Sequence, residues 1–591
     1  RLVDFNKLRL LLGDNAVEDT PEVYDFTWVG KRAALQEAVA PINKTLRPCP
    51  EESVDWDKTQ NLYIEGDNLE VLKLLQNSYM GKVKMIYIDP PYNTGNDFVY
   101  HDDFTQSAEE YDESNRDEEG NRYRRNTDSN GRFHSDWCSM IYTRLMVARS
   151  LLTDNGVIFI SIDENEIQNM RKITDEVFGE SNFISQLGWQ KVYSPKNQAR
   201  YFSNDYEFVL CYCKNISSFS INLLPRTEAM NARYKNPDND PRGDWKAGDC
   251  VGNGVRSQGY YDVVSPKTGK VFNVPQGKHW VYARDNMMKM IEDNRIWFGK
   301  DGNSFPAVKQ FLSDVTGRRP SSLLMYEDYG HTDMAKKDLI KLFKDLENVP
   351  FDTPKPVKLI KMLSIIGSDK EDIVLDFFSG SATTAQAIME LNEETQSNRK
   401  FILVQMPEII DDNPGAIKIG LNNIAEVGKE RIRRAGKTIK EENPLTAQDL
   451  DTGFRVFKCD SSNYKDVAFA PKDYTQDMLA GLLDNIKEDR TDLDLLFDCM
   501  LRWGVELSLP LSTTKVDGCT IHNVNDGDLV ACFDGNVTEA VIDAIADLSP
   551  LRVVFRDSSF NEAAQKMNLF ELFKQKCDWT DEEVKNNVRV I

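Results

Sequence analysis

A loop of four residues has the side chains best suited to chemistry in this sequence. Asp89, Pro90, Pro91 and Tyr92 follow the apolar run 84–88, which is typical of a buried strand. The loop offers a carboxylate that accepts hydrogen bonds, backbone carbonyls held by the fixed φ of proline, and a flat ring for stacking. A planar aromatic amine that has left a nucleic-acid stack needs these groups. A tight Pro-Pro turn that only closes the strand is the alternative interpretation.

A second loop with binding chemistry lies about 290 residues further along the chain. The stretch 372–385 indicates a strand, a tight loop of small residues and a helix in succession, with Asp376, Phe377, Ser379 and Gly380 at the turn. In this arrangement, backbone N–H groups and a helix N-terminus can meet an anionic or dipolar ligand. Nucleotide enzymes of many kinds use such loops, and a plain tight turn is the alternative.

Two further segments place polar side chains after a predicted strand. The stretch 61–75 indicates a strand, a Gly-Asp turn and a helix, and either Asp67 or Asn68 is expected to cap that helix. Gln405 ends the predicted strand 400–405, where a carboxylate or amide would bind ribose hydroxyls.

Alternating strands and helices must position these loops. Buried-strand patterns recur at 83–88, 157–163, 372–376 and 400–405, with helical spacing between them, which implies a parallel sheet. In such sheets the loops that leave the carboxyl ends of the strands form the site. The alternation stops from 182 to 350, where aromatic, basic and turn residues interleave as the reading of base edges requires. A loop-rich substrate or interaction domain is the alternative there.

The loop at Asp89 resembles the Asp-Pro-Pro-Tyr motif of amino-methylating DNA methyltransferases. The loop at Asp376 resembles their cofactor motif, usually written Asp-x-Phe-x-Gly-Ser-Gly, with Ala382 where the last glycine is usual. Because that small position mainly permits close helix packing, we expect alanine to be a mild departure. Thr353 and Lys355 match the family's Thr-x-Lys-Pro motif.

The order of the motifs, with the catalytic loop first, resembles the β class of these enzymes. Over about residues 60–580, the chain resembles the modification subunit of Type III restriction-modification systems. It implies S-adenosylmethionine as cofactor and double-stranded DNA with a flipped adenine as substrate. The implied catalytic residues are Asp89, Pro90, Pro91 and Tyr92. The implied cofactor-binding residues are Asp67, Asn68, Thr353, Lys355, Asp376, Phe377, Ser379, Gly380 and Gln405.

The resemblance also implies individual roles. Asp89 and the Pro90 carbonyl would accept the amino hydrogens of adenine, and Tyr92 would stack on the base. Asp376 would hold the methionine ammonium, and Asp67 would accept from the amino group of the cofactor's adenosine. No metal is needed, because sulfonium is already a good leaving group. A homodimer and a restriction (helicase-nuclease) subunit are the implied partners.

We therefore predict an α/β protein with a doubly wound, Rossmann-like methyltransferase core that is circularly permuted, an inserted target-recognition domain and a C-terminal α/β domain. We expect an N-terminal arm at 1–55, a first core segment with the catalytic loop at 56–181, the recognition domain at 182–350, a second core segment with the cofactor loop at 351–440, and a C-terminal interaction and dimerisation domain at 441–591. A polar segment at about 107–135 is expected to form a mobile loop or lid.

Composition restricts the function classes. The net charge is −23, yet residues 181–350 hold 24 Lys and Arg against 19 Asp and Glu, a local balance of +5 that fits a DNA-facing surface. There is no run of about 18 apolar residues and no secretory profile, so we expect a cytoplasmic, nucleoid-associated protein without membrane contact. Ten scattered cysteines without Cys-x-x-Cys or paired His spacing argue against structural zinc.

Several rival functions stay open. The methylated amine could belong to cytosine, RNA or a protein glutamine, although Asp before Pro-Pro-Tyr favours adenine. A dinucleotide oxidoreductase would want Gly-x-Gly-x-x-Gly after the strand, which the stretch 372–385 lacks. A non-catalytic DNA-binding specificity subunit is the non-enzyme alternative, and the intact Asp89, Tyr92 and Asp376 argue against it.

Overall fold

The fold is that of a computed structural model. It describes residues 25–95, 98–100, 123–125, 131–195, 197, 199–346, 350–410, 413–465, 485–560 and 563–591. The expected N-terminal arm is therefore described only from residue 25, and most of the expected lid at 107–135 lies outside these ranges. Within them, no helix has the length and apolar character needed to cross a membrane.

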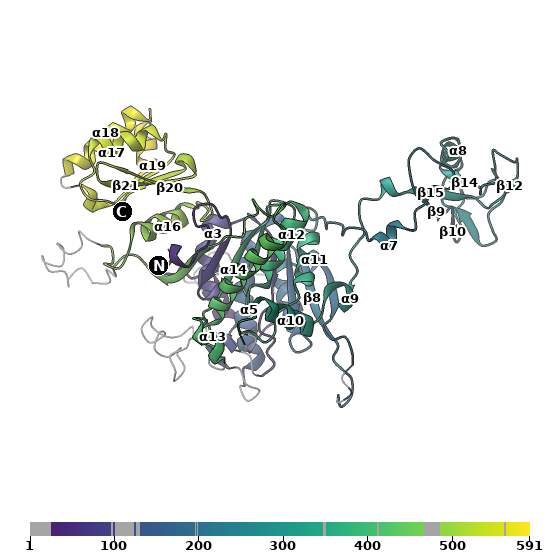
Figure 1. The fold of residues 1–591 in the computed structure, drawn as a ribbon, viewed down its shortest axis with the longest axis horizontal. Helices are drawn as coiled ribbons and strands as arrows, with labels where there is room; N and C mark the ends of the chain where they lie inside the picture. The colour runs from purple at the N-terminus through teal and green to yellow at the C-terminus, as the bar shows by residue number, and fades with distance from the viewer. Residues whose placement is uncertain are drawn as a thin grey trace, which may run out of the picture. The chain divides into compact units, whose positions relative to one another are not determined.

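A ten-stranded sheet forms the centre of the fold (Figure 1). In spatial order its strands are β1 (Lys44–Pro48), β19 (Arg455–Ser461), β2 (Leu62–Glu65), β18 (Lys400–Gln405), β17 (Ile373–Asp376), β3 (Val83–Ile88), β6 (Leu152–Ile162), β8 (Tyr206–Cys213), β7 (Phe183–Gln190) and β16 (Leu323–Leu324). The six strands from β19 to β6 run parallel, whereas β1 and β8 are antiparallel to their neighbours. The predicted α/β class with a mostly parallel sheet is confirmed.

Helices cover both faces of the parallel strands, which explains their continuous apolar runs. Met85 and Phe159 lie against Gly367 of one helix, whereas the alternate residues Ile86 and Ile158 belong to the core that contains Leu145 of another. The first group of packed helices is α11 (Val357–Gly367), α12 (Thr383–Thr395) and α14 (Ile424–Glu442). The second group is α3 (Asn68–Tyr79), α5 (Phe133–Leu151) and α6 (Ile167–Phe178), joined by α2 (Lys31–Val39).

Two segments far apart in the sequence become neighbours in this sheet. β3 and β17 pair in parallel, with Met85 opposite Val374 and Ile86 opposite Leu375. Both strands therefore end at the same edge, where the chain continues into the loops at Asp89 and Asp376. This juxtaposition is the geometric condition on which the predicted site depends.

A separate compact unit lies within the range 182–350 that was predicted for the recognition domain. It spans 221–321, and the boundaries of the recognition domain stay a prediction. β7 and β8 belong to the central sheet. The helices α9 (Tyr326–Tyr329) and α10 (Thr332–Leu342) belong to the main unit, which comprises residues 1–220 and 322–591. The sequence did not reveal that β8 belongs to the central sheet, because β8 is antiparallel and lacks the strand-helix alternation that marks the parallel part.

The unit at 221–321 is built from short strands around an aromatic core. Its described elements are α7 (Glu228–Asn231), β9 (Trp245–Asp249), β10 (Val251–Asn253), β11 (Val263–Val264), β12 (Val271–Phe272), β13 (Lys278–Trp280), α8 (Arg284–Glu292), β14 (Ile296–Trp297) and β15 (Ala307–Phe311). Inside it, the buried Lys309 pairs with Asp238 and, at 2.8 Å, with Asp240. The unit thus has a core and a charge network of its own.

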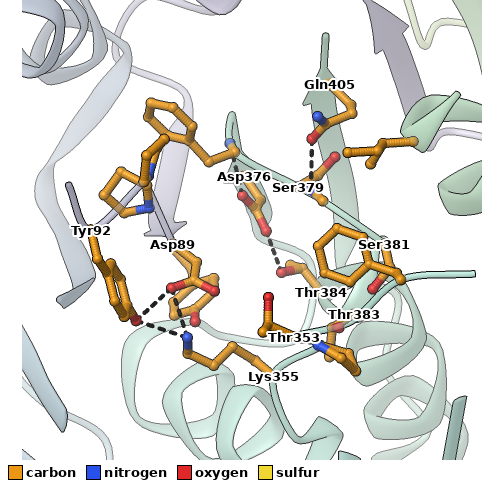
Figure 2. Close-up of a pocket in the computed structure, with 18 of the residues that line it drawn as sticks. Asp89, Tyr92, Thr353, Lys355, Asp376, Ser379, Ser381, Thr383, Thr384 and Gln405 are labelled. Carbon is orange, nitrogen blue, oxygen red and sulfur yellow. Dashed lines mark hydrogen bonds and ion pairs between the residues drawn. The ribbon is translucent and has the colours of Figure 1, made fainter. Parts of the chain in front are cut away.

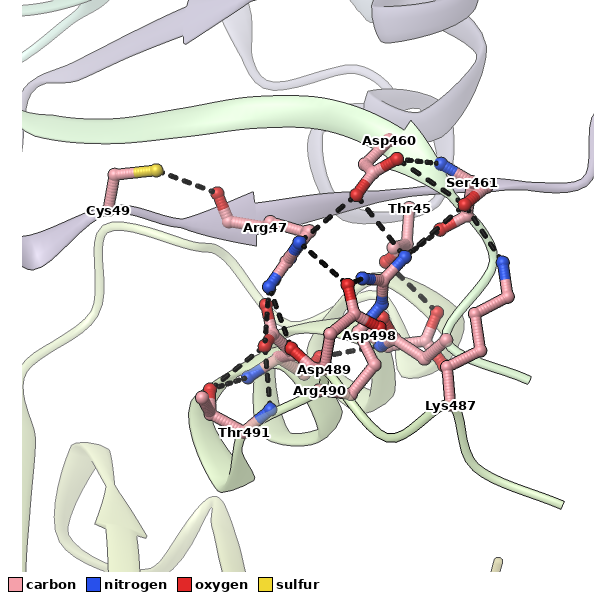
Figure 3. Close-up of polar contacts among 12 residues, drawn as sticks. Thr45, Arg47, Cys49, Asp460, Ser461, Lys487, Asp489, Arg490, Thr491 and Asp498 are labelled. Carbon is pink, nitrogen blue, oxygen red and sulfur yellow. Dashed lines mark hydrogen bonds and ion pairs between the residues drawn. The ribbon is translucent and has the colours of Figure 1, made fainter. Parts of the chain in front are cut away.

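The terminal domain boundaries also differ from the prediction. β1, expected in the N-terminal arm, pairs with β19, expected in the C-terminal domain, and both complete the central sheet. Helix α16 (Asp492–Trp503) packs on β1 and α3. Ion pairs join these segments. Arg47 pairs with Asp460 at 3.2 Å, as Figure 3 shows, and with Asp494 at 3.1 Å. Because these pairs link segments about 410 and 450 residues apart, sequence order could not reveal them.

A second, five-stranded sheet follows, with order β20-β21-β22-β23-β24 and its own apolar core. Its elements are β20 (Leu511–Val516), β21 (Cys519–Val524), β22 (Leu529–Cys532), α17 (Glu539–Asp547), β23 (Val553–Phe555), α18 (Ala563–Lys576), α19 (Asp581–Asn587) and β24 (Val588–Val590). This second sheet and its helices lie within the range 441–591 predicted for the C-terminal domain and begin at Leu511.

Candidate active site

A cavity of about 740 Å³ lies at the edge where β3 and β17 end. Its lining contains all the predicted site residues except Asp67. These are Asn68, Asp89, Pro90, Pro91, Tyr92, Thr353, Lys355, Asp376, Phe377, Ser379, Gly380 and Gln405. The two predicted motifs therefore line one cavity.

The loop after β3 is fixed by hydrogen bonds to neighbouring elements. The Pro91 carbonyl accepts from Nε1 of Trp137 at 2.7 Å, and the buried Asn93 donates to Glu166 at 2.6 Å. Asn93 has a φ of 60°, a left-handed conformation that asparagine tolerates better than most residues. The backbone of this loop is therefore held in place independently of any ligand.

Within that loop, Asp89 is part of a charged network (Figure 2). Its Oδ1 accepts hydrogen bonds from the Tyr92 hydroxyl and from the Lys355 ammonium, each at 2.8 Å. Lys355 Nζ also lies 2.8 Å from the Tyr92 oxygen and 4.9 Å from the centroid of its ring. Burial raises the pKa of the Asp89 carboxyl, and the charge of Lys355 opposes that rise. Lys355, predicted to bind cofactor, therefore contacts the predicted catalytic residues.

A second carboxylate completes this network, and sequence analysis missed it. Glu207 Oε2 lies 3.1 Å from the Tyr92 hydroxyl, which donates its one proton over the shorter distance to Asp89, and Glu207 pairs with Lys355 at 3.4 Å and Lys191 at 3.2 Å. Burial would raise the pKa of Glu207, but the two lysine charges outweigh burial and hold that pKa below its usual value. One signal was available: a charged residue directly before the apolar run 208–213.

The loop after β17 has a different electrostatic character. Asp376 is buried, and its carboxylate accepts from the Thr384 hydroxyl at 2.6 Å and from the Phe378 N–H at 3.1 Å. Burial raises the pKa of Asp376 to about 7, because these neutral donors compensate the burial only in part. A cation that entered the cavity at this point would stabilise the ionised carboxylate.

The small-residue loop is tightly wound between Asp376 and α12. Gly380 has a φ of 49°, and a Cβ there would lie 3.2 Å from the Phe351 ring, so glycine keeps this part of the cavity open. Ala382 has a φ of 60° and a ψ of 38°, the left-handed region. The backbone here favours glycine for a reason besides the expected helix packing, and alanine costs about 1–2 kcal/mol.

Gln405 and Asn68 hold the loop backbone. Gln405 Oε1 accepts from the Gly380 N–H at 2.7 Å, and Asn68 Nδ2 donates to the Phe377 carbonyl at 2.9 Å. Both side chains also line the cavity. They connect the ends of β18 and β2 to the loop after β17.

Asp67 does not line the cavity. It caps α3, as one interpretation predicted, by accepting from the N–H groups of Leu69 at 2.9 Å and Glu70 at 3.1 Å. Its other carboxylate oxygen pairs with the buried Arg144 at 3.0 Å. The predicted acceptance from an adenosine amino group stays a prediction, because Oδ2 has only the one donor among the described contacts.

Comparison with known proteins assigns the family. A sequence model of the family described as DNA methylase, of the N6/N4 class, matches residues 83–412. The StyLTI Mod subunit of a Type III restriction-modification enzyme from Salmonella typhimurium is 34% identical over 77% of this chain and 69% of its own length. The EcoP15I Mod subunit from Escherichia coli is 31% identical over 96% of this chain and 92% of its own.

Among solved structures, the complex of M1.HpyAVI with SAM is similar at a TM-score of 0.27 and 15% identity, covering 63% of this chain and 98% of that one. The chain belongs to the N6/N4 DNA methylase family, a family of S-adenosylmethionine-dependent DNA amino-methyltransferases.

Proposed function

We propose that this chain methylates the exocyclic amino group of a flipped adenine in double-stranded DNA, as the modification and specificity subunit of a Type III restriction-modification system. The main support is that Asp89 and Asp376, at the ends of adjacent parallel strands, line one cavity. One carboxylate is set among charged partners and the other among neutral donors. The cavity thus has an acceptor for an amine and, beside it, a separate acceptor for a cation.

The residues of the second loop fit the methionine end of the cofactor. Asp376 offers a buried carboxylate for an ammonium, Gly380 leaves space that a Cβ would reduce, and the N-terminus of α12 favours a carboxylate. Phe377, Ser379 and Gln405 would line the same end. When bound, S-adenosylmethionine supplies a methyl group on a positively charged sulfur. No part of this assignment needs a metal ion.

The residues of the first loop would orient the amine. Asp89 and the Pro90 carbonyl would accept the two amino hydrogens, so that the nitrogen lone pair leaves conjugation with the ring and points away from both acceptors. Tyr92 would stack on the base and offset part of the unstacking cost of a few kcal/mol. Because the reacting groups are held in line, proximity and orientation would supply most of the rate enhancement.

We propose roles for the remaining regions as well. The sheet is that of a doubly wound, circularly permuted methyltransferase core, and the unit at 221–321 reads the target sequence. The C-terminal sheet from 511 mediates homodimerisation or contact with a restriction subunit. The relatives whose names identify them as Mod subunits of Type III restriction-modification enzymes support contact with a restriction subunit. The proposed site of action is the cytoplasmic chromosome.

One experiment tests the reaction. The full chain is incubated with methyl-tritiated S-adenosylmethionine and unmethylated genomic DNA, and the DNA is digested to nucleosides and separated. Label in N6-methyldeoxyadenosine supports the proposal. Label in N4-methyldeoxycytidine, or no label in DNA, overturns it. The Asp89→Ala chain serves as the control for contaminating methyltransferases.

A further inference from the structure

Lys355 occupies the place that the proposed function reserves for the target amine. Its ammonium donates to Asp89 Oδ1 at 2.8 Å and lies 4.9 Å from the centroid of the Tyr92 ring. It also lies 5.9 Å from the ring of Trp189, which lines the same cavity. An incoming amino group needs this acceptor and this ring face. The lysine must therefore leave Asp89 before the base can bind there.

Glu207 offers the lysine a second partner without a large movement. Its Oε2 lies 3.4 Å from Lys355 Nζ, and its side chain is 12% exposed against 11% for that of Lys355. The network holds two lysines, Lys355 and Lys191, and two carboxylates, Asp89 and Glu207. The ammonium therefore keeps a carboxylate partner when it moves from Asp89 to Glu207, and Asp89 keeps hydrogen-bond donors in the Tyr92 hydroxyl and the incoming amino group.

We propose that Glu207 is a positioning residue that accepts Lys355 when the target amino group takes its place on Asp89. This inference rests on the proposed function and concerns the step after DNA binding. Glu207 does not touch the reacting atoms; it acts through the lysine. Without its carboxylate, Lys355 would keep Asp89 as its carboxylate partner within the network and would compete with the base for it.

The test is a double-mutant cycle measured with the full chain, tritiated cofactor and genomic DNA. Glu207→Gln is expected to lower kcat roughly tenfold, the effect of one partly lost charge interaction, while KM for DNA stays within about twofold. In a Lys355→Met background, the additional Glu207→Gln change is expected to have no effect on kcat, because the competing ammonium is absent. Calorimetric titration with S-adenosylmethionine should give unchanged affinity for Glu207→Gln.

A matched control separates this role from general damage. Asp175 also accepts from a tyrosine hydroxyl, that of Tyr212 at 2.6 Å, and pairs with the cation of Arg171 at 3.0 Å, but it lies on α6 outside the cavity. Asp175→Asn should therefore leave kcat unchanged. The inference is overturned if Glu207→Gln retains wild-type kcat, or if the two changes multiply in the double variant.

A second measurement covers the case in which Lys355→Met has too little activity for the cycle. A crystal structure of the wild-type chain with a duplex that contains its methylation site should place Lys355 Nζ on Glu207 and the amino group on Asp89. A lysine that still contacts Asp89 beside a bound base overturns the inference. Failure of the proposed function is distinct, because the wild-type chain would then transfer no methyl group to adenine.

Discussion

Asp89 and Asp376 follow neighbouring parallel strands, line one cavity, and yet have opposite surroundings. Asp89 accepts from the ammonium of Lys355 and the hydroxyl of Tyr92. The donors recorded at Asp376 are neutral: a threonine hydroxyl and a backbone N–H. The chain thus provides a cation to one carboxylate and leaves the other without one among the described contacts.

This difference separates two kinds of binding. Asp89 is ion-paired with Lys355, so a ligand group must replace the lysine to reach it. Asp376, with a pKa raised to about 7 by burial, lacks compensation that a cationic ligand can supply. Two carboxylates one strand apart are therefore prepared for different ligands by their environments and not by their residue type.

The largest effect is expected from Asp89→Ala. The change removes the acceptor that orients the amine, so methyl transfer should fall by a factor of about a thousand or more. Cofactor affinity should stay within about twofold, because Asp89 belongs to the other end of the cavity. Initial rates with tritiated cofactor and calorimetric titration measure the two effects. A variant that keeps a tenth of the wild-type rate would contradict the role.

Asp376→Asn should produce the reverse pattern in binding. Asparagine is isosteric but cannot supply a negative charge, and a hydrogen bond to a charged group contributes about 1.5–3 kcal/mol. Affinity for S-adenosylmethionine should therefore fall roughly ten- to hundredfold, as measured by calorimetry. Asp89→Asn, the matched control, should bind cofactor as the wild type does. Equal losses for the two variants would remove the distinction between the carboxylates.

The meeting of these two carboxylates could be predicted from the sequence, because carboxyl ends of parallel strands share one edge and each strand has a clear apolar run. Glu207 could not be predicted in the same way. It lies at the amino end of β8, and since β8 is antiparallel, its beginning reaches the edge where the parallel strands end. A rule that considers only strand carboxyl ends excludes such a residue.

Other features were hidden for reasons of geometry. Nothing in the residue type of Ala382 indicates its left-handed backbone. The pairing of β1 with β19 joins segments about 410 residues apart, which no local pattern encodes. Local periodicity is enough for single elements, such as the strands at 83–88 and 400–405, and fails where long-range pairing decides which domain an element joins.

The raised pKa of Asp376 also predicts how stability depends on pH. Between its usual pKa and about 7, the folded chain keeps a proton that the unfolded chain releases, so the free energy of unfolding falls as pH rises through that window. Asp376→Asn removes this loss. Its melting temperature should exceed that of the wild type by a few degrees at pH 8, with a smaller difference at pH 5. If the difference in melting temperature were the same at both pH values, it would contradict the raised pKa of the buried Asp376 carboxyl.

The smallest effect is expected from Thr384→Val, which removes one donor to Asp376 and keeps the shape of the side chain. The hydroxyl, 2.6 Å from the carboxylate, favours its ionised form, so its loss should raise the pKa of Asp376 further. At pH 7 cofactor affinity should fall about fivefold, the equivalent of about 1 kcal/mol, and less at pH 8.5, where the carboxylate ionises more fully. Thr384→Ser keeps the hydroxyl and should bind as the wild type does. If serine were as damaging as valine, the methyl group of Thr384 and not its hydrogen bond would be what Asp376 depends on, and the contrast with Asp89 would rest on packing instead of charge.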